Sequence, residues 1–194
     1  MPINSRTSRS RGVTASVLSI AMFGCAMRTH QIPPVATEPD VAAVYAAIIS
    51  AETPPQAGAP ILVAPVTHPP LDSDYCRPTT VTESDAWRSA IDDYVAVRHI
   101  EAKIPSTLPV PRSRYRLLPR ETKSTRGCHS QKPYSFIVIS RMGFDTTRTF
   151  AVVHRAHACS CMECGDGRDV FLRKQNGEWR IVQPTGVTGC GWIS

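Results

Sequence analysis

One hairpin dominates the C-terminal part of the chain, where residues 169–183 read DVFLRKQNGEWRIVQ. The dipeptide Asn176-Gly177 favours a two-residue type I′ turn, because both residues tolerate a positive φ and the flanking residues alternate between apolar and polar. A loop of this length places Lys174 opposite Trp179. We therefore expect one face of the hairpin to belong to the core, through these side chains: Val170, Leu172, Trp179 and Ile181.

Segments on either side of this hairpin also have the composition of strands. Residues 134–140 are apolar and β-branched, residues 148–157 alternate, and residues 191–193 read GWI near the end of the chain. Together they predict an antiparallel β-meander over the last third of the chain. Residues 61–66 are also apolar, but Pro65 cannot donate to a β-ladder, so we expect a strand there only at an edge or beside a bulge.

Two segments have the apolar spacing of helices. The first starts at Asp40, a predicted N-cap, and ends before Pro54; the second covers residues 82–102 and ends before Pro105. Their apolar stripes are Val41, Val44, Tyr45, Ile48 and Ile49 in the first helix and Trp87, Ala90, Ile91, Tyr94 and Val95 in the second. We expect the two N-terminal helices to pack on the meander in one α+β domain, residues 40–194.

The N-terminus has the pattern of a bacterial export signal, residues 1–25. Three arginines precede an apolar run at residues 13–23 that is too short to span a bilayer, and Met22-Phe23-Gly24-Cys25 resembles a lipobox. We expect Cys25 to be lipidated; cleavage after Ala26 is the alternative. Residues 26–39 contain three prolines and predict a tether. The chain is thus expected in the periplasm or outer envelope, touching a membrane only through its N-terminus.

The charge of the chain gives little reason to expect a nucleic-acid partner. The formal net charge is +6, from 22 Lys and Arg against 16 Asp and Glu. Removing residues 1–24 deletes three arginines and no acid, which leaves 19 minus 16, or +3. Six basic residues lie within residues 112–126, but Tyr115 is the only aromatic residue among them, so we interpret this segment as a solvated loop rather than a polyanion site.

Six cysteines remain when Cys25 is set aside. An even number of cysteines in an exported chain favours disulfides, because the oxidising compartment pairs thiols and each bridge typically stabilises by ~2–4 kcal/mol. We expect the domain to be stapled by these residues: Cys76, Cys128, Cys159, Cys161, Cys164 and Cys190.

A metal site is the alternative use of the same segment. His157, Cys159, Cys161 and Cys164 combine imidazole and thiolate groups, which is the ligand set for zinc or copper. His154 is excluded from that site, because alternation along a strand puts it on the face opposite to His157.

Chemistry beyond these cysteines is weakly indicated. A thiol enzyme would need a cysteine beside a base, which only Cys128-His129 or Cys159 with His157 offer, and no phosphate-binding glycine loop or Gly-x-Ser-x-Gly elbow occurs. We therefore expect no catalytic residues and no cofactor, and interpret the protein as a non-enzymatic binding or structural module; its ligand or partner is not indicated.

The C-terminal third resembles a group of uncharacterised exported bacterial proteins. The resemblance lies in residues 139–145 (ISRMGFD), the loop ending Cys164-Gly165, the hairpin NGEW at residues 176–179 and the closing WIS at residues 192–194. It implies a shared fold and no assigned activity. The order of helices and strands is similar, at the level of fold alone, to the nuclear-transport-factor-2-like cone.

The same resemblance bears on disulfide pairing. The group carries two cysteines in its loop where this chain has three, which suggests a bond between Cys159 and Cys164. We then expect Cys161 to pair with Cys190, tying the meander to the final strand, and Cys76 to pair with Cys128.

Overall fold

The fold is given by a computed structural model that describes residues 39–70, 76–80, 85–119, 134–159 and 165–193. All of these belong to one compact unit, Ile32–Ser194. The predicted export signal (1–25), with Cys25, and all but the last residue of the predicted tether (26–39) lie outside the described residues. Within the described ranges, no helix has the length and apolar character needed to cross a membrane.

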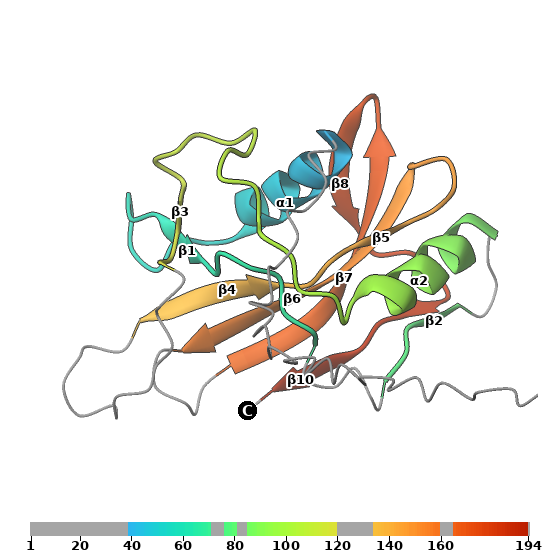
Figure 1. The fold of residues 1–194 in the computed structure, drawn as a ribbon. Helices are drawn as coiled ribbons and strands as arrows, with labels where there is room; N and C mark the ends of the chain where they lie inside the picture. The colour runs from blue at the N-terminus through green and yellow to red at the C-terminus, as the bar shows by residue number, and fades with distance from the viewer. Residues whose placement is uncertain (1–38, 71–75, 81–84, 120–133, 160–164, 194) are drawn as a thin grey trace, which may run out of the picture. The chain divides into compact units, whose positions relative to one another are not determined.

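The described residues form two helices and ten strands (Figure 1). The helices are α1 (Pro39–Ala51) and α2 (Asp85–Val97). The strands are β1 (Ile61–Val63), β2 (Thr79–Thr80), β3 (Tyr115–Leu117), β4 (Ser135–Ile139), β5 (Gly143–Phe144), β6 (Phe150–Cys159), β7 (Gly165–Gln175), β8 (Glu178–Val182), β9 (Val187–Thr188) and β10 (Gly191–Ile193). The predicted α+β class is confirmed.

The sheet is mixed rather than antiparallel throughout. Its order is β10-β7-β6-β4-β1-β3, with β8 paired to β7 and β5 to β6, while β2 and β9 form a separate pair. The strands from β4 onward pair antiparallel, but β1 pairs parallel with both β3 and β4. The prediction of an edge strand near Pro65 is therefore wrong: β1 ends at Val63, so the missing N–H of Pro65 does not interrupt the ladder.

The β7–β8 hairpin has the predicted register. Lys174 pairs with Trp179, and the turn residues Asn176 and Gly177 have φ angles of 52° and 83°, in the left-handed region that the sequence favoured. Three of the four expected core side chains of the hairpin are buried, but Ile181 is 43% exposed. Its face of the hairpin is therefore only partly covered.

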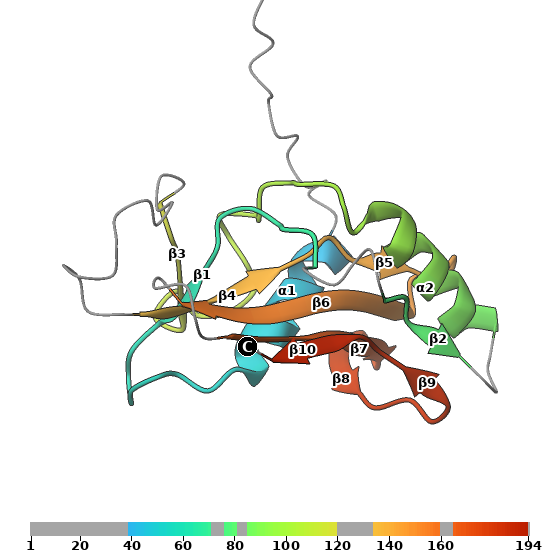
Figure 2. The ribbon, with the colours of Figure 1, turned by 90° about the horizontal axis from the view of Figure 1, so that it is seen from below.

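The helices pack in different core clusters on opposite faces of the central strands. Helix α1 packs with Val153 and Leu172, whereas α2 packs with Val152 and Phe171. Successive side chains of a strand point to opposite faces, so β6 and β7 bury apolar residues on both sides. Figures 1 and 2 show α1 beside β8 and α2 beside β5. The expectation of a single buried face was therefore incomplete.

The apolar stripes of both helices and the end of α1 before Pro54 were predicted correctly, whereas the N-cap of α1 and the end of α2 were not; residues 82–84, the predicted start of the second helix, lie outside the described residues. All five stripe residues of α1 are buried, as are those of α2 except Val95. The predicted N-cap Asp40 lies inside α1, where its carboxylate accepts hydrogen bonds from Lys174 Nζ at 2.6 Å and Trp179 Nε1 at 3.0 Å. Helix α2 ends at Val97, before the predicted residue 102.

Helix α2 lies so close to β5 that only glycine fits between them. A Cβ atom on Gly143 would lie 1.9 Å from the backbone nitrogen of Tyr94 and 2.7 Å from the carbonyl oxygen of Ala90. The obstructing atoms belong to the helix backbone, so they could move only with α2 itself. Gly143 thus sets the height at which α2 and its side chains sit above the sheet.

Candidate functional site

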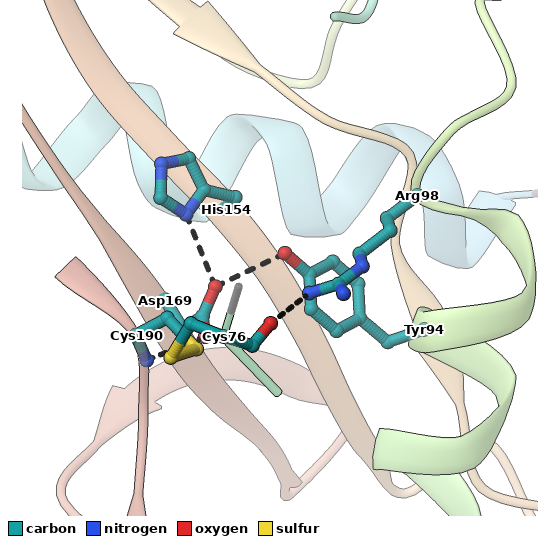
Figure 3. The surroundings of a disulfide bond; sticks show 6 residues. All are labelled: Cys76, Tyr94, Arg98, His154, Asp169 and Cys190. Carbon is teal, nitrogen blue, oxygen red and sulfur yellow. Dashed lines mark hydrogen bonds and ion pairs between the residues drawn. A yellow bond between two sulfur atoms is a disulfide. The ribbon is translucent and has the colours of Figure 1, made fainter. Parts of the chain in front are cut away.

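A disulfide joins Cys76, just before β2, to Cys190, between β9 and β10 (Figure 3). The pairing of β2 with β9, with Thr79 opposite Thr188, brings the two cysteines together. The predicted pairs Cys76–Cys128 and Cys161–Cys190 are therefore wrong. Local sequence could not reveal the pair, because its members are 114 positions apart.

The remaining cysteines can be placed only in part. Cys159 is also disulfide-bonded. Cys128, Cys161 and Cys164 lie outside the described residues, so the predicted bond between Cys159 and Cys164 stays a prediction.

A buried polar cluster surrounds the disulfide. Asp169 Oδ1 accepts a hydrogen bond from the Tyr94 hydroxyl at 3.0 Å and lies 3.1 Å from His154 Nδ1. Asp169 Oδ2 accepts the backbone N–H of Cys190 at 2.7 Å. On the other half of the disulfide, Arg98 donates to the carbonyl oxygen of Cys76 at 3.0 Å (Figure 3). The cluster therefore links α2, β6 and β7 to both ends of the disulfide.

The His154–Asp169 pair has the form of a general base held by a carboxylate, but its surroundings do not suit catalysis. His154 is only 3% exposed, and its Nε2 atom has no hydrogen-bond partner among the described residues. Burial, reinforced by the charge of Asp169, raises the pKa of Tyr94, so its hydroxyl stays a donor. We interpret this cluster as structural.

Two buried side-chain nitrogens, one on His154 of this cluster and one on Trp192 of β10, lie over Gly167. A Cβ atom on Gly167 would lie 2.3 Å from Trp192 Nε1 and 2.6 Å from His154 Nε2. Neither nitrogen has a partner among the described residues. Because Gly167 has no side chain, the indole of Trp192 can extend from β10 across β7.

A second polar cluster lies on the α1 side of the sheet, where four side chains form a closed network of ion pairs. Glu52, next to the C-terminal end of α1, contacts Arg155 Nε at 3.1 Å through one oxygen and His157 Nε2 at 2.9 Å through the other. Asp166 on β7 contacts His157 Nδ1 at 2.9 Å and Arg155 Nη1 at 3.5 Å. Both oxygens of each carboxylate are thus engaged. We call these four residues the charge network.

The network favours the charged forms of His157, Glu52 and Asp166. The hydrogen bond to Glu52 raises the pKa of His157 against the opposing effect of burial, and Asp166 adds to the rise. Arg155 Nη1, 2.9 Å from His157 Nδ1, opposes protonation but does not outweigh the two carboxylates. Burial disfavours ionised Glu52 and Asp166, yet the hydrogen bond from His157 and the charges of His157, Arg155 and Arg168 lower the pKa of both.

A cleft of about 780 Å³ opens beside the charge network. It lies along one edge of β7, where β8 (paired at residues 171–175) and β10 (paired at residues 166–168) part from each other. Its charged lining residues are Glu52, Arg155, His157, Arg168 and Asp169. Its apolar wall carries Ile48, Phe171, Ile181, Val182 and Val187. The cleft thus offers an apolar surface next to fixed charges.

The predicted metal ligands do not assemble in the described residues. His157 uses both ring nitrogens on carboxylates, and Cys159 is in a disulfide rather than a thiolate. No group of three His, Cys, Asp or Glu side chains in the described ranges is arranged to hold a metal. His157 was the one member of the charge network that the sequence analysis singled out; Glu52, Arg155 and Asp166 were missed, because nothing in the sequence indicates their proximity.

No protein-family model, no curated protein and no solved structure matches this chain. Its function is therefore inferred from the geometry of its own residues.

Proposed function

We propose that the chain is an exported protein of the bacterial cell envelope that acts as a non-enzymatic binding module, with the cleft beside β7 as its ligand site. The observation that carries this proposal is the cleft itself. Its volume of about 780 Å³ falls within the roughly 300–1,000 Å³ of small-molecule sites, and its walls combine apolar side chains with a few charged groups.

Ile181 supports a ligand on the apolar wall. Hydrophobic pairing in the β7–β8 hairpin would bury this side chain, yet it is 43% exposed and faces the cleft beside Ile48 and Val182. An apolar molecule seated there would remove this surface from water, at roughly 25 cal/mol per Å² buried.

Two features support the location. Residues 1–25 have the pattern of an export signal, and the bond between Cys76 and Cys190 is of the kind that persists in oxidising compartments.

Lipidation of Cys25 is part of the same proposal. Mass spectrometry of the protein purified from bacterial membranes tests it: a lipidated N-terminal cysteine is the expected result, and a chain starting after Ala26 would favour cleavage without an anchor.

The cleft can be tested with N-phenyl-1-naphthylamine, an uncharged dye that fluoresces in apolar sites. We expect the full oxidised chain to bind this dye, and Ile181→Asp to weaken binding by roughly tenfold or more, because burying an Ile side chain is worth ~1.5–3 kcal/mol. Ile100→Asp is the matched control, since Ile100 is 42% exposed and is not part of the cleft.

Each variant must first show a normal thermal unfolding transition. Absence of dye binding, or equal weakening by the two substitutions, would contradict a binding site in this cleft.

A further inference from the structure

The charge network leaves one cation of the cleft without an acidic partner. All four carboxylate oxygens of Glu52 and Asp166 are engaged by Arg155 and His157. Arg168 is exposed on the same wall and forms no ion pair within the described residues. Asp169 also lines the cleft, but its carboxylate is buried and engaged by Tyr94, His154 and the backbone N–H of Cys190, so it is not a partner for Arg168.

The position of Arg168 makes its charge accessible. Its cross-strand neighbour on β6 is Arg155, a like charge that pushes the exposed guanidinium away from the sheet. Its neighbour on β10 is Gly191, which has no side chain to cover it; a Cβ there would lie 3.6 Å from Arg168 Cβ. The guanidinium can therefore be reached from the cleft.

Charged side chains lie near the guanidinium on three elements. Glu52 follows α1, β6 carries Arg155 and His157, and β7 carries Asp166 and Asp169. Glu52 and Asp166 attract Arg168 through their charge, but each forms its ion pairs with Arg155 and His157 instead. An external anion is the partner that the wall lacks.

We infer that the natural ligand of the cleft is a small amphipathic anion, an apolar body carrying one carboxylate, sulfonate or phosphate group. The anionic group contacts the guanidinium of Arg168, whose planar fork donates two parallel hydrogen bonds to such groups. The apolar body lies along Ile48, Ile181 and Val182. This inference rests on the proposed binding function and names the chemistry of the ligand for that site.

The inference can be tested with two dyes that differ by one sulfonate group. N-phenyl-1-naphthylamine is neutral, and 8-anilinonaphthalene-1-sulfonate is the same skeleton with a sulfonate. In the full oxidised chain at low salt, Arg168→Gln should weaken sulfonate-dye binding by roughly threefold to fivefold, the range of a solvent-exposed ion pair, and leave neutral-dye binding unchanged. Added salt should weaken only the sulfonate dye, and only when Arg168 is present.

Arg116→Gln is the matched control, because Arg116 is an exposed arginine on β3 and is not part of the cleft. It should alter neither affinity. Equal effects of the two arginine substitutions, or unchanged sulfonate-dye binding in Arg168→Gln, would overturn the inference of an anionic ligand. If the neutral dye still bound in that case, the proposal of a binding cleft would stand. If neither dye binds the full chain, both proposals fail together.

Discussion

At the scale of single residues, Trp179 connects the hairpin to the start of α1. Its ring is 6% exposed, packs edge-on against Phe144 with centroids 5.6 Å apart, and its Nε1–H donates to Asp40 at 3.0 Å. We expect Trp179→Ala to lower the free energy of unfolding by about 3–5 kcal/mol. Trp179→Phe, which keeps much of the ring but removes the donor, should cost about 1–3 kcal/mol.

Urea denaturation followed by circular dichroism measures both losses. A loss below about 1 kcal/mol for Trp179→Ala would show that the ring contributes little to the core.

The residue-scale contacts that could be predicted are those between near neighbours in the sequence. The pair Lys174–Trp179 followed from a two-residue turn, whereas their shared partner Asp40 lies more than 130 positions away. The same limit explains the candidate site. His157 was noticed because cysteines follow it closely, but its actual partners are carboxylates from outside β6, Asp166 on β7 and Glu52 after α1.

At the scale of elements, the C-terminal end of α1 depends on a distant arginine. The last turn of α1 contains no basic residue, and Arg114 Nη2 instead donates to the carbonyl oxygens of Ser50 at 3.1 Å and Glu52 at 2.6 Å. We expect Arg114→Ala to lower the free energy of unfolding by about 1–2 kcal/mol, since it removes charged donors from helix carbonyls. Arg116→Ala, two residues further along and exposed, should cost less than about 0.5 kcal/mol.

Thermal and urea unfolding of the two variants, measured side by side, give the comparison. Similar small losses would mean that water satisfies the carbonyl oxygens at the end of α1 as effectively as Arg114 does.

Elements with strong periodicity were predictable, and those held by distant pairing were not. The stripes of α1 and α2 repeat at helical spacing, so burial of one side could be foreseen. Strand β1 has only three residues, and it is defined as a strand by its parallel pairing with β3 and β4. The two-residue strands β2, β5 and β9 are too short to carry a pattern. Continuous burial along β6 explains why helices cover both faces.

At the scale of the whole molecule, the disulfide between Cys76 and Cys190 closes most of the described domain into a loop. Its sequence separation is 114 residues, for which the chain-entropy model gives a stabilisation of about 4–5 kcal/mol. We expect Cys76→Ser, Cys190→Ala and the double variant to lose nearly the same free energy of unfolding, because each removes the same bond.

Equilibrium denaturation under non-reducing conditions tests this equality. Losses that add in the double variant would show that the two cysteines stabilise the fold through other contacts.

The charge network makes stability depend on pH with a definite sign. The pKa of His157 is raised in the folded chain, first by its hydrogen bond to Glu52, so its contribution is complete below the unfolded value of about pH 6.5 and is lost as the pH rises through the higher folded value. The pKa of His68 is lowered by burial, so its contribution to stability changes with pH in the opposite direction.

Comparing two proteins that both contain His68 isolates the contribution of His157. We therefore expect the difference in free energy of unfolding between wild type and His157→Gln to shrink between about pH 6 and pH 8. Urea denaturation of both proteins at several pH values measures this difference, and a difference that stays constant across that range would show that His157 is not charged between Glu52 and Asp166.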